Sequence, residues 1–381
     1  MPEFGDQAIL SIDLDALGAN WRRLRDLAPT AECAGVVKAD AYGLGADRVG
    51  PALWAAGCRR FFVAHSSEAL DLRRHLPDAN IHILHGPAPG AEDELTAAGL
   101  SPVLSTPAQI AAWQAAARRA GRALPAALQV DTGMNRLGLS PQEAEAVAAD
   151  PARLAGLEIG FVMSHLACAD EPDHPLNNQQ HERFLAWRQR FPGLKGSLAN
   201  SAGIFLGADF HHDLLRPGIA LYGANPLSPA AGSRRDQAKM HQVVHLQGRI
   251  LQVRSVDRAG TVGYGAAYIV EKPSRIATVA VGYADGFMRS LSNRGWAAIK
   301  GHQGYVRVPI AGRISMDLIT LDVSAVAEAE CRPGTAVDLI GGGVDIDEQA
   351  AAGGTIAYEL LTQLGHRYRR VYAGTGAGMA A

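Results

Sequence analysis

Lys38 is the residue whose type and position most clearly suggest chemistry. It ends an apolar run, residues 33–37, and a glycine-containing segment, residues 39–45, follows at once. A lysine that closes a buried strand is desolvated on one side and reachable on the other. Desolvation disfavours the ammonium form, and a neutral amine can form a Schiff base with an aldehyde. The alternative is an ordinary surface lysine at a strand end. Other residues of the chain are needed to distinguish the two.

The elements that would position Lys38 alternate in type from residue 15 to about residue 220. Helical patterns such as 106–121 lie between short apolar runs. The predicted strands are 33–37, 60–64, 81–84, 102–104, 126–130, 157–163, 197–199 and 213–215. Strands separated by helices indicate parallel βαβ units, and eight in succession predict a closed, TIM-like (β/α)8 barrel. A doubly wound open sheet competes, but its early GxGxxG motif is absent.

The second half of the chain has a different pattern. The β-rich segments are 243–253, 274–281, 297–300, 305–310 and 316–323, and helical periodicity is scarce until 356–364. This pattern predicts a mainly β domain. The fold class is therefore α/β plus β, with an N-terminal barrel over residues 12–235 and a β-rich domain over 236–381. We expect strand 7–13 to join the second domain.

Polar residues follow many of the predicted barrel strands. They are Lys38 and Tyr42 after the first, Asp131 and Arg136 after the fifth, His165 after the sixth, Asn200 and Ser201 after the seventh, and Arg216 after the eighth. The carboxyl ends of barrel strands meet at one mouth, where active sites of this fold lie. Taken singly, His165 could be a hydrogen-bonded core residue and Ser201 a helix cap. Their convergence favours a site.

The loops after the seventh and eighth strands suit a phosphate group. Residues 200–203 offer a hydroxyl and backbone N–H groups at the start of a predicted helix. Gly218 lets the backbone approach closely, and Ile219 follows it. A phosphate site, a Schiff-base lysine and a polar group for a ring nitrogen together describe pyridoxal 5'-phosphate (PLP).

Composition excludes several classes of protein. The chain has 381 residues, 48% of them hydrophobic, and a formal net charge of -2, so no electrostatic argument supports nucleic acid or an anionic membrane as partner. No apolar stretch reaches spanning length. The four cysteines lack CxxC spacing, which favours neither a metal site nor disulfides. We expect no metal and, because no secretory h-region is present near residue 1, a cytoplasmic location.

These motifs resemble those of the alanine racemase family of PLP enzymes, in order and over nearly the whole chain. The similar segments are 37–43, 131–138, 164–170, 200–201, 216–223, 262–265, 281–286, 312–317 and 355–359. The resemblance implies a two-base reaction on alanine. Lys38 would hold PLP and act on one face of the substrate Cα, and Tyr264 of the partner subunit would act on the other, in a head-to-tail homodimer.

The resemblance also implies roles for the remaining site residues. An unperturbed tyrosine, with a pKa near 10, is a poor base, and His165, bonded to Tyr264 and Arg216, would tune it. Arg216 would also contact the pyridine nitrogen. Implied contacts of the phosphate and its surroundings are Tyr42, Asn200, Ser201, Gly218, Ile219 and Tyr358. Arg136 would meet the cofactor's phenolic oxygen and, with Met316, the substrate carboxylate, while Tyr283 would narrow the entrance.

Two positions depart from the family pattern. Some members have a carbamylated lysine where this chain has Gln129, and a neutral glutamine cannot form that group. The charge that helps to position Arg136 must then come from elsewhere, and a bound anion such as chloride is one candidate. Leu44 stands where histidine is common, which removes a titratable group near the phosphate but no assigned catalytic role.

Three alternatives stay open at the level of sequence. One is racemisation of another amino acid, such as serine, lysine or arginine. A PLP-dependent decarboxylase would need a carboxylate partner for the ring nitrogen and a cysteine-centred motif in the second half, and neither is evident. A PLP homeostasis protein resembles the barrel alone, would end near residue 230 and would lack Tyr264. The sequence also leaves open whether D-alanine is made for peptidoglycan or catabolised.

Overall fold

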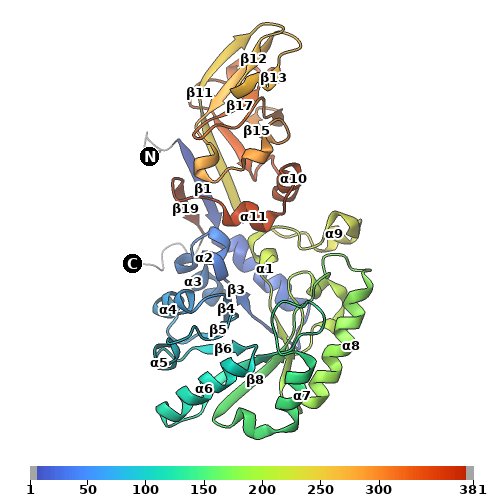
Figure 1. Cartoon of the computed structure of the whole chain (residues 1–381). Helices are drawn as coiled ribbons and strands as arrows, with labels where there is room; N and C mark the ends of the chain where they lie inside the picture. Colours follow the sequence, from blue (N-terminus) through green and yellow to red (C-terminus); the bar gives the residue numbers. More distant parts are fainter. Residues whose placement is uncertain (1–6, 375–381) are drawn as a thin grey trace. The chain divides into compact units, whose positions relative to one another are not determined.

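A computed structural model describes residues 7–374 (Figure 1). The chain forms two compact units, one from residues 15–241 and the other from residues 7–14 and 242–374. The last residues of the predicted second domain, 375–381, lie outside the described part. Within residues 7–374, no helix is both long and apolar enough to cross a bilayer.

The first unit, here called the barrel unit, is built on parallel strands. In sheet order they are β3 (Gly35–Val36), β4 (Arg60–Val63), β5 (Asn80–Ile83), β6 (Ser101–Leu104), β7 (Leu124–Gln129), β8 (Leu157–Met163) and β9 (Lys195–Ser197). β10 (Leu214–Leu215) pairs in parallel with β2 (Glu32–Cys33). Arg216 N–H donates to the Ala199 carbonyl at 3.0 Å, and Ala34 N–H donates to the Leu215 carbonyl at 3.0 Å. These bonds close the ring, so the predicted TIM-like barrel is confirmed.

Helices follow most of the barrel strands. They are α1 (Leu14–Asp26), α2 (Lys38–Gly43), α3 (Ala46–Ala56), α4 (Ser66–His75), α5 (Glu92–Ala97), α6 (Pro107–Ala120), α7 (Pro141–Ala149), α8 (Pro175–Arg190) and α9 (Arg234–Gln237). Helix α6 shows why these segments fold locally: Thr106 caps it by accepting the Gln109 N–H, and Gly121 ends it with a φ of 62°. Because helices cover the outside of the barrel, strands such as β4 are apolar on both faces.

The second unit, here called the β unit, is mainly sheet. Its strand order is β16 (Gly304–Pro309), β15 (Trp296–Gly301), β18 (Ala336–Ile340), β11 (Val244–Val256), β1 (Ala8–Asp13) and β19 (Arg369–Ala373). Two further strands, β14 (Ser274–Val279) and β17 (Ile319–Asp322), pair with each other, and β14 also pairs with β11. A small hairpin joins β12 (Thr261–Val262) to β13 (Tyr268–Ile269). β1 is antiparallel to β11 and parallel to β19.

Several details of the β unit differ from the sequence expectation, which did not include β12, β13, β18 or β19. The strand predicted over 316–323 begins only at Ile319, and Met316 lies in the preceding loop. The Met316 carbonyl accepts an N–H from Ala284, which lies in a short turn and not in a strand. A helix was missed at α10 (Ile346–Ala352), which Asp345 caps by accepting two backbone N–H groups; α11 (Ala357–Thr362) matches the predicted helical segment.

Candidate active site

Lys38 begins a turn of left-handed helix at the carboxyl end of the first barrel strand. The next four residues, Ala39, Asp40, Ala41 and Tyr42, have φ between 52° and 57°. Left-handed backbone costs roughly 1–2 kcal/mol for each residue that is not glycine. Four consecutive residues in this region are held only if their surroundings fix them, and such strain commonly marks a functional site.

Glu68 is one of the residues that hold this turn. Its Oε1 accepts the Ala39 N–H at 2.6 Å, directly after Lys38. Its Oε2 accepts the N–H groups of Ala64 and His65, at 2.8 and 3.0 Å, where helix α4 begins. The carboxylate therefore joins the start of α4 to the turn that bears the lysine. We did not predict Glu68 from sequence, although an acidic side chain in the first turn of a helix is a capping signal.

The surroundings of Lys38 favour its neutral amine. The residue is half-buried, and this burial lowers the pKa of its amine from the ordinary lysine value. The positive charge of Arg136 lowers this pKa further, whereas the carboxylate of Glu68 opposes the shift. Lys38 is thus close to an arginine after β7 and to an acid after β4, as the convergence of strand ends at a barrel mouth requires.

Tyr42, Ser201 and Gly218 come together beside this turn. Ser201 Oγ accepts the N–H groups of Gly218 at 2.8 Å and Ala220 at 3.3 Å. A Cβ at Gly218 would collide with the Tyr42 hydroxyl, so only glycine fits. Within residues 7–374 we find no acceptor for the Ser201 hydroxyl hydrogen. The structure thus groups two hydroxyls with a tightly packed backbone at the residues predicted to contact a phosphate, and buried Ile219 begins the short 3-10 turn Ile219–Tyr222 there.

Arg216 is buried inside the barrel, with carbonyl and hydroxyl oxygens around its guanidinium. It donates to the carbonyls of Ser164 at 2.6 Å and Leu198 at 3.3 Å, and to Ser197 Oγ. Burial lowers the pKa of Arg216 to about 9, so the side chain remains charged at neutral pH. Ser197 was not predicted as a site residue, because a serine inside a strand carries no distinctive pattern.

His165 lies close to this buried charge. Burial, and then the positive charges of Arg216, Arg136 and Lys38, lower the pKa of His165 to about 3. The imidazole is therefore neutral at physiological pH and retains a nitrogen that can accept a proton or a hydrogen bond. A direct hydrogen bond from Arg216 to His165 stays a prediction.

The loop that carries Arg136 is held by side chains that bond to its backbone. The Asp131 carboxylate accepts N–H groups of Gly133, Met134 and Asn135 at 2.8–3.2 Å. Gln129 is buried, and its Nε2 donates to the Leu137 carbonyl at 3.1 Å, one residue beyond Arg136. The amide of Gln129 thus restrains the loop through a neutral hydrogen bond. In the loop after β9, Asn200 Oδ1 accepts the Gly203 N–H at 2.9 Å. Contact of Asn200 with a cofactor stays a prediction.

Gln180, on helix α8, was missed by sequence reasoning. It is fully buried, its Oε1 accepts the Ala167 N–H at 2.8 Å, and its Nε2 donates to the His165 carbonyl at 2.9 Å and to Thr132 Oγ1 at 3.2 Å. One side chain therefore joins the loops after β7 and β8. A glutamine in a polar helix gives no sign of this contact in the sequence.

The β unit carries Tyr264 on a short 3-10 turn, Tyr264–Ala266, after β12. The flanking Gly263 and Gly265 have φ of 76° and 67° and lie against Arg313. Two segments distant in sequence thus meet, and the Tyr264 side chain is 69% exposed. Contact of this exposed ring with a partner subunit stays a prediction.

Tyr283, Met316 and Tyr358 are also exposed side chains of the β unit. Tyr283 begins a 3-10 turn, Tyr283–Asp285, whose backbone bonds to the loop that holds Met316. Tyr358 lies in the first turn of α11. The barrel unit therefore carries the predicted lysine, arginines and histidine with most of the predicted phosphate contacts, and the β unit carries Tyr264, Tyr283, Met316 and Tyr358.

A closed parallel barrel with a half-buried lysine at a strand end and a buried arginine, together with a mainly β unit, matches the barrel class of PLP enzymes. Comparisons with known proteins agree. Family models for the alanine racemase N-terminal and C-terminal domains match residues 12–226 and 243–372. The chain belongs to the alanine racemase family, whose members are PLP-dependent isomerases.

Individual relatives are similar over almost their full length. The alanine racemase of Rhodospirillum rubrum is 54% identical over 97% of both chains. The catabolic alanine racemase of Agrobacterium fabrum is 50% identical over 99% of this chain and 95% of that protein. The crystal structure of alanine racemase from Bartonella henselae, with covalently bound pyridoxal phosphate, has a TM-score of 0.89 and 40% identity, and covers 97% of this chain and 100% of that one.

Proposed function

We propose that this protein interconverts L-alanine and D-alanine by a two-base mechanism, in a head-to-tail homodimer with shared active sites. The observation that carries the proposal is the position of Lys38, half-buried at the barrel mouth with a lowered amine pKa. The exposed ring of Tyr264 supports its assignment as the second base, supplied by the partner subunit.

The chain's own residues have distinct tasks in this scheme. PLP, when bound, supplies the electron-withdrawing ring that makes the substrate Cα–H acidic. Lys38 Nζ takes or returns the proton on one face of Cα, and the hydroxyl of Tyr264 of the partner subunit does so on the other. A proton removed from one face must be replaced on the opposite face for racemisation, so two bases are needed.

Other residues would bind and orient the cofactor. Tyr42, Ser201 and the backbone at Gly218 and Ile219 would hold the phosphate, with Tyr358 and Asn200 beside it. Arg216 stays charged and offers N–H donors to the ring nitrogen, but an arginine does not readily protonate that atom. Incomplete delocalisation into the ring would then restrain side reactions.

The substrate would meet residues of both units in the dimer. Arg136 would bind the cofactor's phenolic oxygen and the alanine carboxylate, with the backbone at Met316 of the partner subunit. Tyr283 of the partner subunit would narrow the entrance. Neutral His165 would accept a hydrogen bond from Tyr264 of the partner subunit and so adjust its basicity.

Exchange in D2O tests the two-base mechanism. L- and D-alanine are incubated separately with the purified protein, and Cα deuterium and optical rotation are followed. Tyr264→Phe should suppress exchange strongly for one enantiomer and leave cofactor absorbance unchanged. Tyr305→Phe is the matched control, since Tyr305 is an exposed tyrosine on β16 of the same unit. Equal rates for both enantiomers in Tyr264→Phe would show that the two-base assignment is wrong.

Mixing inactive subunits tests the shared site. Lys38→Ala and Tyr264→Phe are each inactive as homodimers, but a mixed dimer holds one site with both bases intact. Random reassociation should restore about a quarter of the wild-type activity, since half of the dimers are mixed and each has one intact site. No restored activity in dimers shown to be mixed would refute the sharing of residues between subunits.

The physiological role within this proposal is either supply of D-alanine for peptidoglycan or catabolism of alanine. Similarity to the catabolic enzyme of Agrobacterium fabrum supports the second, and similarity to relatives named simply alanine racemase leaves the first in place. Expression measured in the source organism separates them. Constant expression would support supply of D-alanine for peptidoglycan, whereas induction by alanine would support catabolism of alanine.

A further inference from the structure

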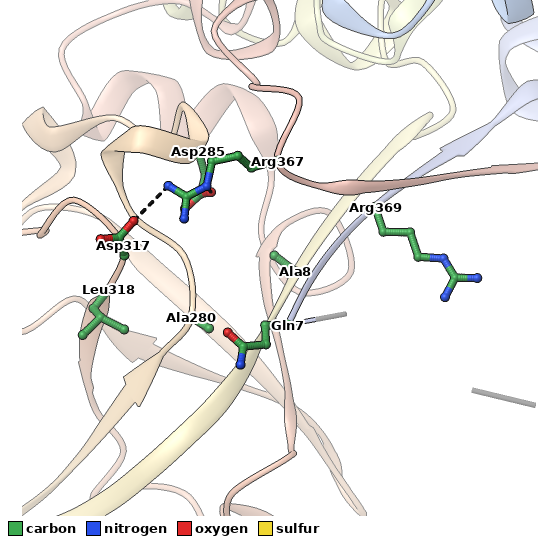
Figure 2. A pocket seen from close by; sticks show the side chains of 8 residues that line it. All are labelled: Gln7, Ala8, Ala280, Asp285, Asp317, Leu318, Arg367 and Arg369. Carbon is green, nitrogen blue, oxygen red and sulfur yellow. Dashed lines mark hydrogen bonds and ion pairs between the residues drawn. The ribbon is translucent and has the colours of Figure 1, made fainter. Parts of the chain in front are cut away.

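Three charged residues of the β unit meet beside the loops that bear Tyr283 and Met316. Asp285 ends the turn after β14, Asp317 precedes β17, and Arg367 lies between α11 and β19. Arg367 Nε lies 3.2 Å from Asp285 Oδ1, and Arg367 Nη1 lies 2.9 Å from Asp317 Oδ1. In Figure 2 the guanidinium lies between the two carboxylates, with its bond to Asp317 drawn as a dashed line.

Asp285 requires a partner because it is buried. Only 8% of its side chain is exposed, and its Oδ2 accepts the Gly282 N–H at 2.8 Å. A buried carboxylate is costly unless it is paired and hydrogen-bonded. Arg367 is the cation that pairs with it among the described residues, so loss of this guanidinium would leave a buried charge uncompensated. Asp317 is more than half exposed, and its pair with Arg367 alone would contribute little.

The backbone joins the same two loops. Tyr283 N–H donates to the Ser315 carbonyl at 3.0 Å, and Ala284 N–H donates to the Met316 carbonyl at 2.9 Å. Gly282 lies so close to the Met316 backbone that a Cβ there would collide with it. These bonds set the register of the two loops, and the rigid, planar guanidinium of Arg367 fixes their separation from a third segment.

On one side, the three charged residues have no packed neighbours among the described residues. A cavity of about 290 Å³ adjoins the three charged residues, lined also by Gln7, Ala8, Ala280, Leu318 and Arg369 (Figure 2). Side chains beside a cavity lose packing contacts on that side. On this side the loops are therefore held by the ion pairs of Arg367 and by backbone hydrogen bonds, with little packing.

We propose that Arg367 is a positioning residue for substrate selection: by joining Asp285 to Asp317 it fixes Tyr283 relative to Met316 and so sets the width of the substrate entrance. The proposal rests on the proposed function, in which Tyr283 and Met316 of the partner subunit line that entrance. A looser pair of loops binds the small substrate alanine less well and discriminates less against larger amino acids.

The test compares Arg367→Gln and Asp317→Asn with the wild-type holoenzyme. The KM for alanine should rise about tenfold in Arg367→Gln, as expected for loss of a hydrogen bond between charged groups, with kcat changed by less than about twofold. The preference for alanine over serine should fall. Asp317→Asn leaves the buried Asp285 paired, so it should fold normally and show the same changes in weaker form.

Arg307→Gln is the matched control. Arg307 is as exposed as Arg367, at 53%, and pairs with Glu348 in the same unit. It should leave KM and the preference for alanine unchanged. Cofactor absorbance and the midpoint of thermal unfolding are recorded for each variant, so that cofactor loss or misfolding is recognised.

Hydrogen–deuterium exchange gives a readout independent of activity. Exchange at the amides of Tyr283 and Ala284 should accelerate in Arg367→Gln and Asp317→Asn but not in Arg307→Gln. Unchanged exchange together with unchanged KM in both variants would overturn the proposal. Faster exchange without a change in KM or preference would also overturn it, since the loops would then be joined without affecting selection. If the wild type fails to racemise alanine, the proposed function fails, while exchange still decides whether Arg367 joins the loops.

Discussion

Replacing Glu68 by alanine should weaken cofactor binding, because this carboxylate holds the left-handed turn that begins at Lys38. The change removes the bond from Ala39 N–H to Oε1, 2.6 Å long, and the two bonds from Ala64 and His65 at the start of α4. The substitution also removes the carboxylate charge that raises the pKa of the Lys38 amine. Any further effect on the lysine must pass through the backbone of the turn.

The size of the effect follows from these bonds. A hydrogen bond to a charged group contributes about 1.5–3 kcal/mol, and the exposed position of Ala39 favours the lower value. Loss of the bonds at the helix start costs about 1 kcal/mol more. The four left-handed residues carry roughly 4–8 kcal/mol of backbone strain, so Glu68 offsets only part of it. We expect a loss of about 2.5 kcal/mol in stability, of which about 1.5 kcal/mol, or roughly tenfold in cofactor affinity, belongs to the turn.

The assay is retention of the cofactor. Holoenzyme is dialysed against buffer and the remaining cofactor absorbance is measured, while unfolding in urea gives the stability. Glu143→Ala is the matched control, because Glu143 Oε2 accepts the Ser140 N–H at 2.9 Å at the start of α7, away from any left-handed turn. Glu143→Ala should be slightly destabilised by the loss of its capping-box bond and should retain its cofactor.

Equal cofactor retention in the two variants would refute this reasoning and leave Glu68 as a helix cap only. A variant that binds cofactor normally but has lost 2.5 kcal/mol would lead to the same conclusion. Glu68→Gln, which keeps an acceptor oxygen, should recover part of the affinity. If it does not, the charge of Glu68 matters more than its hydrogen bond, and the effect on the amine pKa of Lys38 would be the better explanation.

Three further predictions concern the barrel unit. Gly218→Ala should lower cofactor affinity by at least about tenfold, measured by equilibrium dialysis, because its Cβ collides with the Tyr42 hydroxyl. Gln129→Leu should raise the KM for alanine, because the donor to the Leu137 carbonyl is lost, and the wild-type KM should not change when chloride is replaced by sulfate. His165 has a pKa of about 3 in the folded chain, below the unfolded value near 6.5, so the unfolded state binds its proton first. The free energy of unfolding should therefore fall by up to about 1.4 kcal/mol per pH unit from pH 6 to pH 4, and His165→Gln should remove this contribution.

Each of these predictions has a contradicting result. Normal cofactor affinity in Gly218→Ala would mean that the phosphate lies elsewhere, with Gly160→Ala as a control, because a Cβ at Gly160 would meet no atom closer than 3.9 Å. A wild-type KM that depends on chloride would restore a bound anion as the substitute for the carbamate. An unfolding free energy with the same pH slope in wild type and His165→Gln would show that His165 titrates normally in the folded chain.

The strand ends of the barrel were readable from sequence because parallel strands covered on both faces are continuous apolar runs. Lys38, His165 and Arg216 each follow such a run, and the fold brings them to one mouth. The same reasoning could not reveal the left-handed turn. Ala39 and Ala41 have no preference for positive φ, and the bonds that hold them there come from Glu68 and from the packing of Tyr42 against Tyr222.

Contacts between distant segments explain the other omissions. Gln180 and Arg367 lie in polar stretches where most side chains are solvated. Only the folded chain shows that Gln180 is buried and that Arg367 pairs with a buried carboxylate. Met316 was placed in a strand because its neighbours are apolar, but its carbonyl bonds to a turn about thirty residues away in sequence. Local pattern gives the elements, whereas these partners depend on tertiary structure.

Strand β1 has a consequence for synthesis of the protein. It lies between β11 and β19. Ile9 pairs with Arg369, so residues from near the two ends of the described sequence are neighbours in the sheet. The barrel can close as soon as residues up to 241 have left the ribosome, but β1 must wait for the β unit to be made. During that interval an apolar strand with free backbone groups is exposed, which invites pairing with other chains. We therefore expect nascent or truncated chains that end after the barrel to aggregate through residues 8–13 and to depend on chaperones.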